Sequence, residues 1–111
     1  MPNTSIELLK EQIYKGENIW QICDLMIIGA VEMWSSDIHV EPLTNIVRLR
    51  YRIDGELREI LEYQNFLHQQ VVARFKILSN LKIDESRIPQ DGRLSTVINN
   101  KALDLRVSTL P

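Results

Sequence analysis

The sequence predicts an α+β fold in which helices cover one face of an antiparallel sheet. Three observations support this prediction. Apolar residues recur at helical spacing through the first third of the chain, the period changes to two after Ser35-Ser36, and Asp54-Gly55 separates two alternating runs. With 111 residues, 44% of them hydrophobic, the chain has the size of one domain with one core.

Two helices are expected at the start of the chain. Residues 6–14 form the first, which we expect to be peripheral and to end at Gly16. The second begins after Asn18, whose side chain can cap it, and runs to about Trp34. Because the second helix is apolar nearly all round, other elements must cover it on most sides.

Three strands should follow. Residues 37–41 alternate between apolar and polar positions until Pro42 ends the strand. Alternation is strict in residues 47–53, so their apolar side chains should face the core and the others the opposite side. These others are arginines: Arg48, Arg50 and Arg52. Residues 56–61 are the returning strand of a hairpin at Asp54-Gly55.

The remainder of the chain predicts a helix and a second hairpin. Apolar positions at steps of three and four give an amphipathic helix ending near Asn80: Phe66, Leu67, Val71, Phe75, Leu78 and Leu81, with Arg74 on the same face. Residues 82–92 contain Pro89 and a second Asp-Gly, which favours an ordered loop. Residues 94–98 and 103–109 should pair as strands about Asn99-Asn100.

Charge divides the chain unevenly, although the formal total is only −2. Residues 1–47 hold two lysines against seven acids, whereas residues 48–111 hold all eight arginines and three lysines against eight acids. The slightly acidic total argues against a dedicated nucleic-acid binder. Arginine fits phosphate or carboxylate with two parallel hydrogen bonds, so its enrichment indicates shaped anion contacts or an ordinary salt-bridged sheet surface.

The three arginines on one strand face repel one another unless an anion or an acid lies across from them. With a two-residue turn at Asp54-Gly55, Arg50 would lie opposite Glu59. One interpretation is therefore a solvated face held by salt bridges. The other is a phosphate sensor, in which arginines reach a nucleotide held by another domain or subunit.

The residues that could do other chemistry lack suitable surroundings. Asp37, His39 and Glu41 share a strand face, but successive positions lie about 7 Å apart, too far for easy chelation of one ion, so we expect no metal. Cys23 lies in an apolar run and should serve packing. There is no G-x-x-x-x-G-K-[ST] loop. We therefore expect no catalysis by this chain alone.

The sequence does not predict export or a membrane span. No basic segment followed by an apolar one opens the chain, and the longest apolar stretch, residues 19–34, is interrupted by Gln21, Asp24 and Glu32. A single cysteine suits a reducing cytosol.

Four blocks carry a resemblance to a known family: Ser36 to Pro42 (SDIHVEP), Arg50 to Gly55 (RYRIDG), Arg87 to Arg93 (RIPQDGR) and Leu105 to Pro111 (LRVSTLP). In this order they resemble the N-terminal module of the secretion-superfamily traffic ATPases, the general secretory pathway protein E-like enzymes of type II secretion and type IV pilus assembly. Trp34-Ser35 departs from the pattern, since the family usually has Gly-Ala there.

The resemblance implies a PAS-like α+β module over residues 1–111, with a core at 18–111 and a helix at 1–17 that could be a linker. It implies a RecA-like ATPase domain beyond this chain, which would hold ATP and Mg²⁺. It also implies a homo-hexamer at the cytoplasmic face of the inner membrane, in contact with the platform components of the machine. Because of the charge balance, we expect no nucleic-acid partner.

The family's site is carried over onto matching positions only. Candidate γ-phosphate sensors are Arg50, Arg52, Arg93 and Arg106, with Arg87 as a weaker fifth. Candidate subunit or domain contacts are Asp37, His39 and Glu41 on the strand and Pro89, Gln90, Asp91 and Gly92 in the expected loop. The apolar second helix could present a further contact patch.

Three alternatives stay open. The first is the same module in a competence or conjugation motor. The second is a free-standing PAS-like module that binds a small ligand, which would need an internal cavity. The third is a metal-dependent hydrolase using Asp37, His39 and Glu41, which the spacing disfavours.

Overall fold

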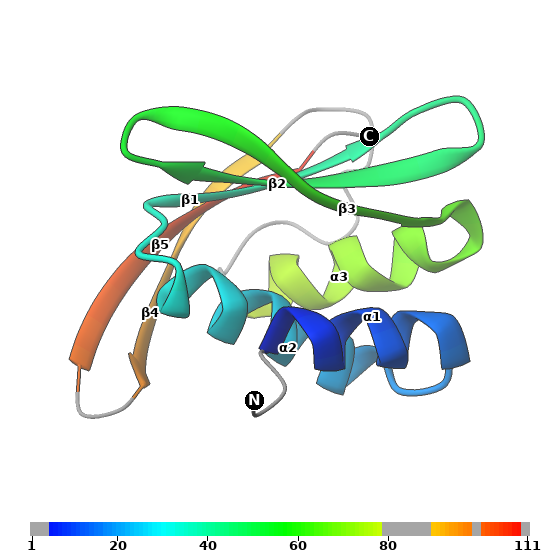
Figure 1. The fold of residues 1–111 in the computed structure, drawn as a ribbon, viewed down its shortest axis with the longest axis horizontal. Coiled ribbons are helices and arrows are strands. Elements are labelled where there is room, and N and C mark those ends of the chain that lie inside the picture. Colours follow the sequence, from blue (N-terminus) through cyan, green and yellow to red (C-terminus); the bar gives the residue numbers. More distant parts are fainter. Residues whose placement is uncertain (1–4, 79–89, 99–100, 110–111) are drawn as a thin grey trace.

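The computed structural model describes residues 5–78 with their side chains, and the backbone of residues 90–98 and 101–109. Helices and strands follow the expected order (Figure 1). The elements are α1 (Ser5–Lys15), α2 (Ile19–Glu32), β1 (Asp37–Pro42), β2 (Ile46–Ile53), β3 (Glu56–Gln64), the 3₁₀ turn η1 (Asn65–Leu67), α3 (His68–Leu78), β4 (Gln90–Ile98) and β5 (Lys101–Thr109). The predicted α+β class is confirmed.

The five strands form one sheet in the order β3-β2-β1-β5-β4. Neighbouring strands are antiparallel except β1 and β5, which run parallel. The expectation of a wholly antiparallel sheet is therefore wrong at one pairing. The two parallel strands are far apart in the sequence, because a parallel pair needs a long crossover connection. The expectation was wrong because the alternation of residues in a strand does not indicate its direction.

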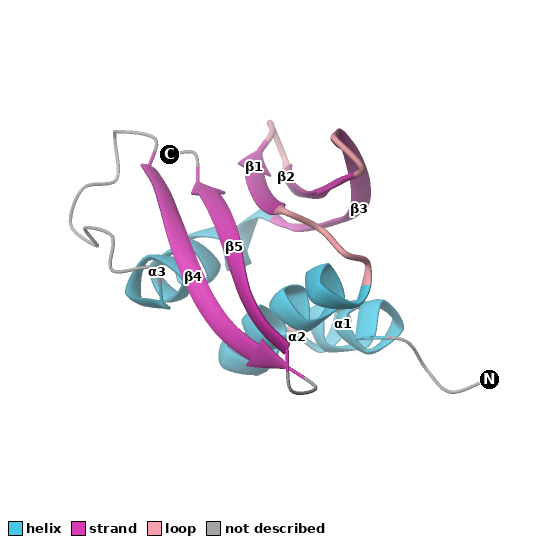
Figure 2. Cartoon of the chain, turned by 90° about the vertical axis from the view of Figure 1, so that its left-hand side faces the viewer, coloured by secondary structure: helices cyan, strands magenta, loops and turns pink. Residues whose placement is uncertain are grey.

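The helices lie on one face of the sheet, as predicted (Figure 1). The β4–β5 hairpin bends down beside the end of the helical layer in both views (Figure 2). The core lies between the layers and includes Ile38, Val40, Val47, Leu49, Tyr51, Leu67, Val71 and Phe75, each at most 1% exposed. Burial of this apolar surface is the main force that holds sheet and helices together.

The first helix is not peripheral, contrary to expectation. In α1, Leu9 is fully buried and Ile13 is only 6% exposed, and both belong to the core cluster. The helix packs against α2, so its apolar stripe has a partner within the chain. Its short length and polar flanks gave no sign of this burial, which depends on where α2 lies.

Helix α2 is covered on most sides, as its composition predicts. Asn18 caps it by accepting a hydrogen bond from the Gln21 backbone N–H at 3.1 Å. Close packing is possible because Gly29 has no side chain: a Cβ there would lie 3.0 Å from Tyr51 Oη and 2.7 Å from Ile6 Cδ1. The hydroxyl of Tyr51 then donates to the Met26 carbonyl at 2.6 Å, which ties the sheet to the helix.

The two buried tyrosines of the sheet should respond differently to loss of their hydroxyls. Tyr51→Phe removes the bond to Met26 and is expected to lower the free energy of unfolding by about 1–2 kcal/mol. Tyr63 is 3% exposed, and its hydroxyl has no hydrogen-bond partner in the described part of the chain. Tyr63→Phe should therefore leave stability unchanged or raise it. Urea unfolding of both variants checks this, and a loss in Tyr63→Phe equal to that in Tyr51→Phe would contradict it.

The end of α2 shows why glycine would be favoured at the position of Trp34. The Trp34 N–H donates to the Val31 carbonyl at 3.1 Å and the Ser35 N–H to the Ala30 carbonyl at 2.9 Å, the pattern of a Schellman motif. In such a motif the residue after the C-cap has a left-handed backbone conformation. Trp34 occupies this position and has φ 57°. Glycine is favoured there because a Cβ is strained.

Trp34→Gly is therefore expected to raise the free energy of unfolding by about 0.5–1 kcal/mol, the relief of strain less the added freedom of the unfolded chain. Trp34 is 71% exposed, so little burial is lost. Met33→Gly is the matched control: at φ −94° it relieves no strain and should lower stability. Thermal unfolding compares the two, and destabilisation by Trp34→Gly would contradict the prediction.

The predicted hairpin at Asp54-Gly55 is confirmed. Both residues have positive φ, 53° and 82°, as a type I′ turn requires. The returning strand is longer than expected and reaches Gln64. Its register with β2 shifts between Leu49 and Arg50, which marks a β-bulge.

The helix after β3 begins with a 3₁₀ turn. Leu67, Val71 and Phe75 are buried as predicted, whereas Phe66 is 69% exposed, so its place on the core face was wrong. The rotation of the 3₁₀ turn differs from that of an α-helix, which moves Phe66 off the apolar stripe. Arg74, expected on the same face, stacks on the Trp20 ring with 3.8 Å between guanidinium carbon and ring centroid.

The last part of the chain forms the predicted hairpin, with β4 and β5 antiparallel about residues 99–100. Two boundaries were wrong: Gln90, Asp91 and Gly92 belong to β4 and not to a loop, and β5 begins at Lys101 and not at residue 103. Pairing with β5 supplies hydrogen-bond partners that the local Asp-Gly signal does not reveal. Residues 79–89, including Leu81, and residues 99–100 lie outside the described part of the chain.

Candidate functional site on the arginine face of the sheet

The alternation of β2 places its arginines on the sheet face opposite the helices. Val47, Leu49 and Tyr51 are fully buried in the core, while Arg48, Arg50 and Arg52 are partly exposed on the other side. On β1, Ile38 and Val40 are buried in the same way, which leaves Asp37, His39 and Glu41 beside the arginines. We name this surface the arginine face.

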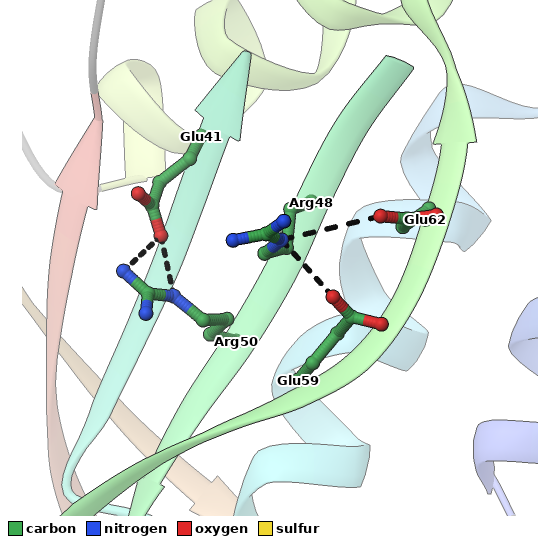
Figure 3. A network of polar contacts seen from close by, with 5 residues as sticks. All are labelled: Glu41, Arg48, Arg50, Glu59 and Glu62. Atoms are coloured by element: carbon green, nitrogen blue, oxygen red, sulfur yellow. Dashed lines mark hydrogen bonds and ion pairs between the residues drawn. The ribbon is translucent and has the colours of Figure 1, made fainter. Parts of the chain in front are cut away.

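Two of the arginines are bound to acids of β1. The Nε of Arg52 donates to Oδ2 of Asp37 at 2.7 Å, and its Nη1 donates to the Gly55 carbonyl at 3.1 Å. Arg50 uses both Nε and Nη2 on one carboxylate oxygen of Glu41 (Figure 3). Glu41 therefore binds two nitrogens of Arg50, whereas Asp37 binds one nitrogen of Arg52.

The third arginine is bound to acids of β3. Arg48 Nε lies 3.0 Å from Glu59 Oε1 and 4.0 Å from Glu62 Oε2 (Figure 3). Sequence reasoning placed Arg50 opposite Glu59, and the Cα register confirms that pairing. The Glu59 carboxylate nevertheless contacts Arg48, because Arg50 turns toward Glu41 on the other neighbouring strand.

These ion pairs offset part of the local positive charge but contribute little to the stability of the fold. The three arginines of β2 keep between 27% and 36% of their side chains exposed. At such exposure, solvent screening leaves each pair worth about 0–1 kcal/mol. The acids offset the repulsion between the three arginines, as the salt-bridge interpretation requires.

The register extends one row of charge across four strands. The Cα partners run Arg52 on β2, Asp37 on β1, Arg106 on β5 and Arg93 on β4. Lateral partners occupy the same face of a sheet, so three of the five candidate sensors share this row. The row, which we name the Arg52–Arg93 row, has three arginines against one aspartate, a formal excess of two positive charges.

The next row has no such excess. It runs Glu59, Arg50, His39, Ser108 and Asp91. Half-burial lowers the pKa of His39 below 6.5, with the nearby Asp37 acting in the opposite direction, so the imidazole is uncharged at neutral pH. Two acids there outnumber one arginine, and positive charge is therefore concentrated in the Arg52–Arg93 row.

The other predicted site residues are distributed as follows. Gln90, Asp91 and Gly92 are paired with Thr109, Ser108 and Val107 within the sheet. Arg87 and Pro89 lie outside the described residues, so their places stay predictions. Sequence reasoning did not single out Glu62, because regular alternation from the turn would place Leu61 opposite Arg48, and only the β-bulge brings Glu62 to that position.

Neither a metal cluster nor an activated thiol is visible in the described residues. No three His, Cys, Asp or Glu side chains there lie together as a metal would need, and Asp37 and Glu41 are bound to arginines. Cys23 is fully buried, and this burial raises the pKa of its thiol from 9.0 to about 12.

No helix in the described residues is long and apolar enough to cross a membrane.

Cys23 should consequently resist alkylation until the protein unfolds. At pH 8 we expect iodoacetamide to label it at least about a hundredfold more slowly than in urea-unfolded protein, because the buried thiolate is scarce. Since the folded pKa is raised, this group stabilises the fold below pH 9, and that contribution is lost as pH rises toward 12. Mass spectrometry of labelled protein measures the rates, and equal rates would contradict the prediction.

Comparison with known proteins identifies the family to which this chain belongs. The type II/IV secretion system protein family matches residues 13–111. The chain belongs to this family, and the resemblance found in the four sequence blocks is confirmed.

Three of the similar proteins are type II secretion proteins. The chain is 44% identical to type II secretion system protein E of Dickeya dadantii over 104 residues, which cover 91% of the chain and 21% of that protein. It is 45% identical over 106 residues to type II secretion system protein E of Xanthomonas campestris, covering 96% of the chain and 18% of the relative. A third relative, 41% identical over 93 residues (84% and 18%), is the type II secretion system ATPase E of Vibrio cholerae. The chain spans about a fifth of the length of these relatives.

Proposed function

We propose that this chain is the N-terminal regulatory and assembly module of an ATPase that powers type II protein secretion. The observation that carries the proposal is the family match over residues 13–111, together with relatives that are about five times longer and include one named as an ATPase. In this proposal a RecA-like domain outside the chain binds ATP and Mg²⁺ and performs hydrolysis. Use of the module in type IV pilus assembly or in a competence or conjugation motor is the alternative within the same family.

The module works as part of a homo-hexamer in the cytoplasm, at the inner membrane, where partner proteins of the secretion machine hold it. Within the hexamer, the polar residues of β1 (Asp37, His39 and Glu41) and the segment from Pro89 to Gly92 contact a neighbouring subunit or the RecA-like domain. The module is PAS-like in this proposal, and residues 1–17 are either a linker helix or part of the module. The burial of Leu9 and Ile13 favours including α1 in the module itself.

The arginine face supplies the γ-phosphate sensors. The excess positive charge of the Arg52–Arg93 row supports this role for Arg52, Arg93 and Arg106, since a transferring phosphoryl group concentrates negative charge. Arg50 is a weaker sensor in this proposal because both of its described contacts go to Glu41. Arg87 retains its rank as the fifth candidate.

Removal of the module from the full-length ATPase tests the proposal. Without residues 1–111 we expect light scattering to show loss of hexamers and ATP turnover to fall by about a hundredfold or more. The isolated module should show no turnover. Full turnover and intact hexamers in the truncated protein would contradict a regulatory and assembly role.

A further inference from the structure

The Arg52–Arg93 row contains a single acid, and its position is unusual. Asp37 lies between Arg52 and Arg106 in the Cα register, at the centre of the excess positive charge. Its residue is 9% exposed, so its carboxylate is poorly solvated. Within the described side chains it is bound to Arg52 Nε at 2.7 Å.

Arg52 is only partly committed to this ion pair. One nitrogen donates to Asp37 and another to the Gly55 carbonyl at 3.1 Å, and 36% of the side chain remains exposed. A guanidinium fork binds carboxylate and phosphate oxygens with the same geometry. A phosphate that approaches the row would therefore compete directly with Asp37 for Arg52.

We propose that Asp37 is an internal competitor for the terminal phosphates of a nucleoside triphosphate. In the empty site the Asp37 carboxylate occupies Arg52 and offsets one of the three positive charges in the row. Binding of a polyphosphate takes Arg52 from Asp37, so the cost of opening this ion pair sets the affinity of the module for phosphate. This inference rests on the proposed function of the arginine face and adds a regulatory residue to it.

Glu41 provides a matched comparison on the same strand. It also binds one arginine, Arg50, and its side chain is similarly shielded, 20% exposed against 12% for Asp37. Its lateral partner, however, is Arg48, which binds acids of β3, so no excess charge surrounds it. Neutralising Glu41 should therefore change stability but should release no arginine of the Arg52–Arg93 row.

The experiment uses the 111-residue chain and inorganic tripolyphosphate as the probe, with affinity measured by titration calorimetry at low salt. Asp37→Asn keeps the shape of the side chain and removes its charge. We expect it to tighten binding about tenfold, which corresponds to about 1.4 kcal/mol. Glu41→Gln should change affinity less than about threefold. Adding Arg52→Ala to Asp37→Asn should abolish the gain.

The outcomes separate this inference from the proposed function. If the wild-type chain binds tripolyphosphate through Arg52 and Arg106 but Asp37→Asn binds no more tightly, the competitor role is wrong and the anion site stands. If Asp37→Asn and Glu41→Gln tighten binding equally, the effect is general charge and the inference is also overturned. If no variant binds, both the competitor role and the anion site are wrong.

A measurement on the wild-type chain covers the case in which Asp37→Asn folds poorly. The Nε–H group of Arg52 gives its own NMR signal, which should reflect the hydrogen bond to Asp37. On titration with tripolyphosphate we expect this signal to shift, while that of Arg50, bound to Glu41, stays within a fraction of that change. An Arg52 signal that does not move at saturation would overturn the proposal.

Discussion

Replacing Arg52, Arg93 or Arg106 by alanine in the full-length ATPase is expected to lower ATP turnover by about a hundredfold or more. Each of the three occupies the row with excess positive charge, and a sensor arginine stabilises the charge of the transferring phosphoryl group. Steady-state turnover measures the loss, and light scattering must show that hexamers persist. Arg50→Ala should have a smaller effect, below about tenfold, because Arg50 is bound to Glu41.

Arg58→Ala is the matched control for these variants. Arg58 lies on β3, is 57% exposed and makes only a 3.9 Å contact with Glu56 among the described ion pairs. Its removal deletes the same side chain at a position outside the row and should leave turnover unchanged. Normal turnover in all three row variants would show that the arginine face is only a solvated or interfacial surface, even though the family assignment holds.

Phe75→Ala is expected to lower the free energy of unfolding of the isolated chain by about 3–5 kcal/mol. Phe75 is fully buried on α3, where the helix packs in the core. Truncation removes the transfer free energy of the ring and leaves a cavity that the sheet and helices can fill only in part. Urea unfolding followed by circular dichroism measures the change.

Ile77 on the same helix is the control for Phe75. It is 52% exposed, so Ile77→Ala loses little burial and should cost less than about 1 kcal/mol. A similar loss in the two variants would contradict the assignment of the effect to burial, since both substitutions introduce the same residue, alanine, which has the highest helix propensity.

The local structure of this protein follows from its sequence. Period-two alternation in β2 predicted which residues are buried and which carry the arginine face, because successive side chains of a strand point to opposite sides. Asp54-Gly55 predicted its turn because only certain residues tolerate positive φ at both positions. The four sequence blocks predicted the family, which the comparison with known proteins confirms.

Tertiary structure decided which charges meet. The pairing of Arg50 with Glu41 and of Arg48 with Glu59 depends on the two neighbours of β2 and on a bulge, and neither is encoded within one strand. The burial of α1 likewise required α2 as its partner.

Sequence and tertiary structure make separate contributions to the Arg52–Arg93 row. Sequence alone placed Arg52, Asp37 and Arg106 on strands, but it ended the last-but-one strand short of Arg93 and could not align the four residues. The alignment arises from the parallel pairing of β1 with β5, two strands far apart in the sequence. Register between distant strands is set by packing of the whole sheet against its helices, and for that reason only the folded chain reveals one aspartate among three arginines.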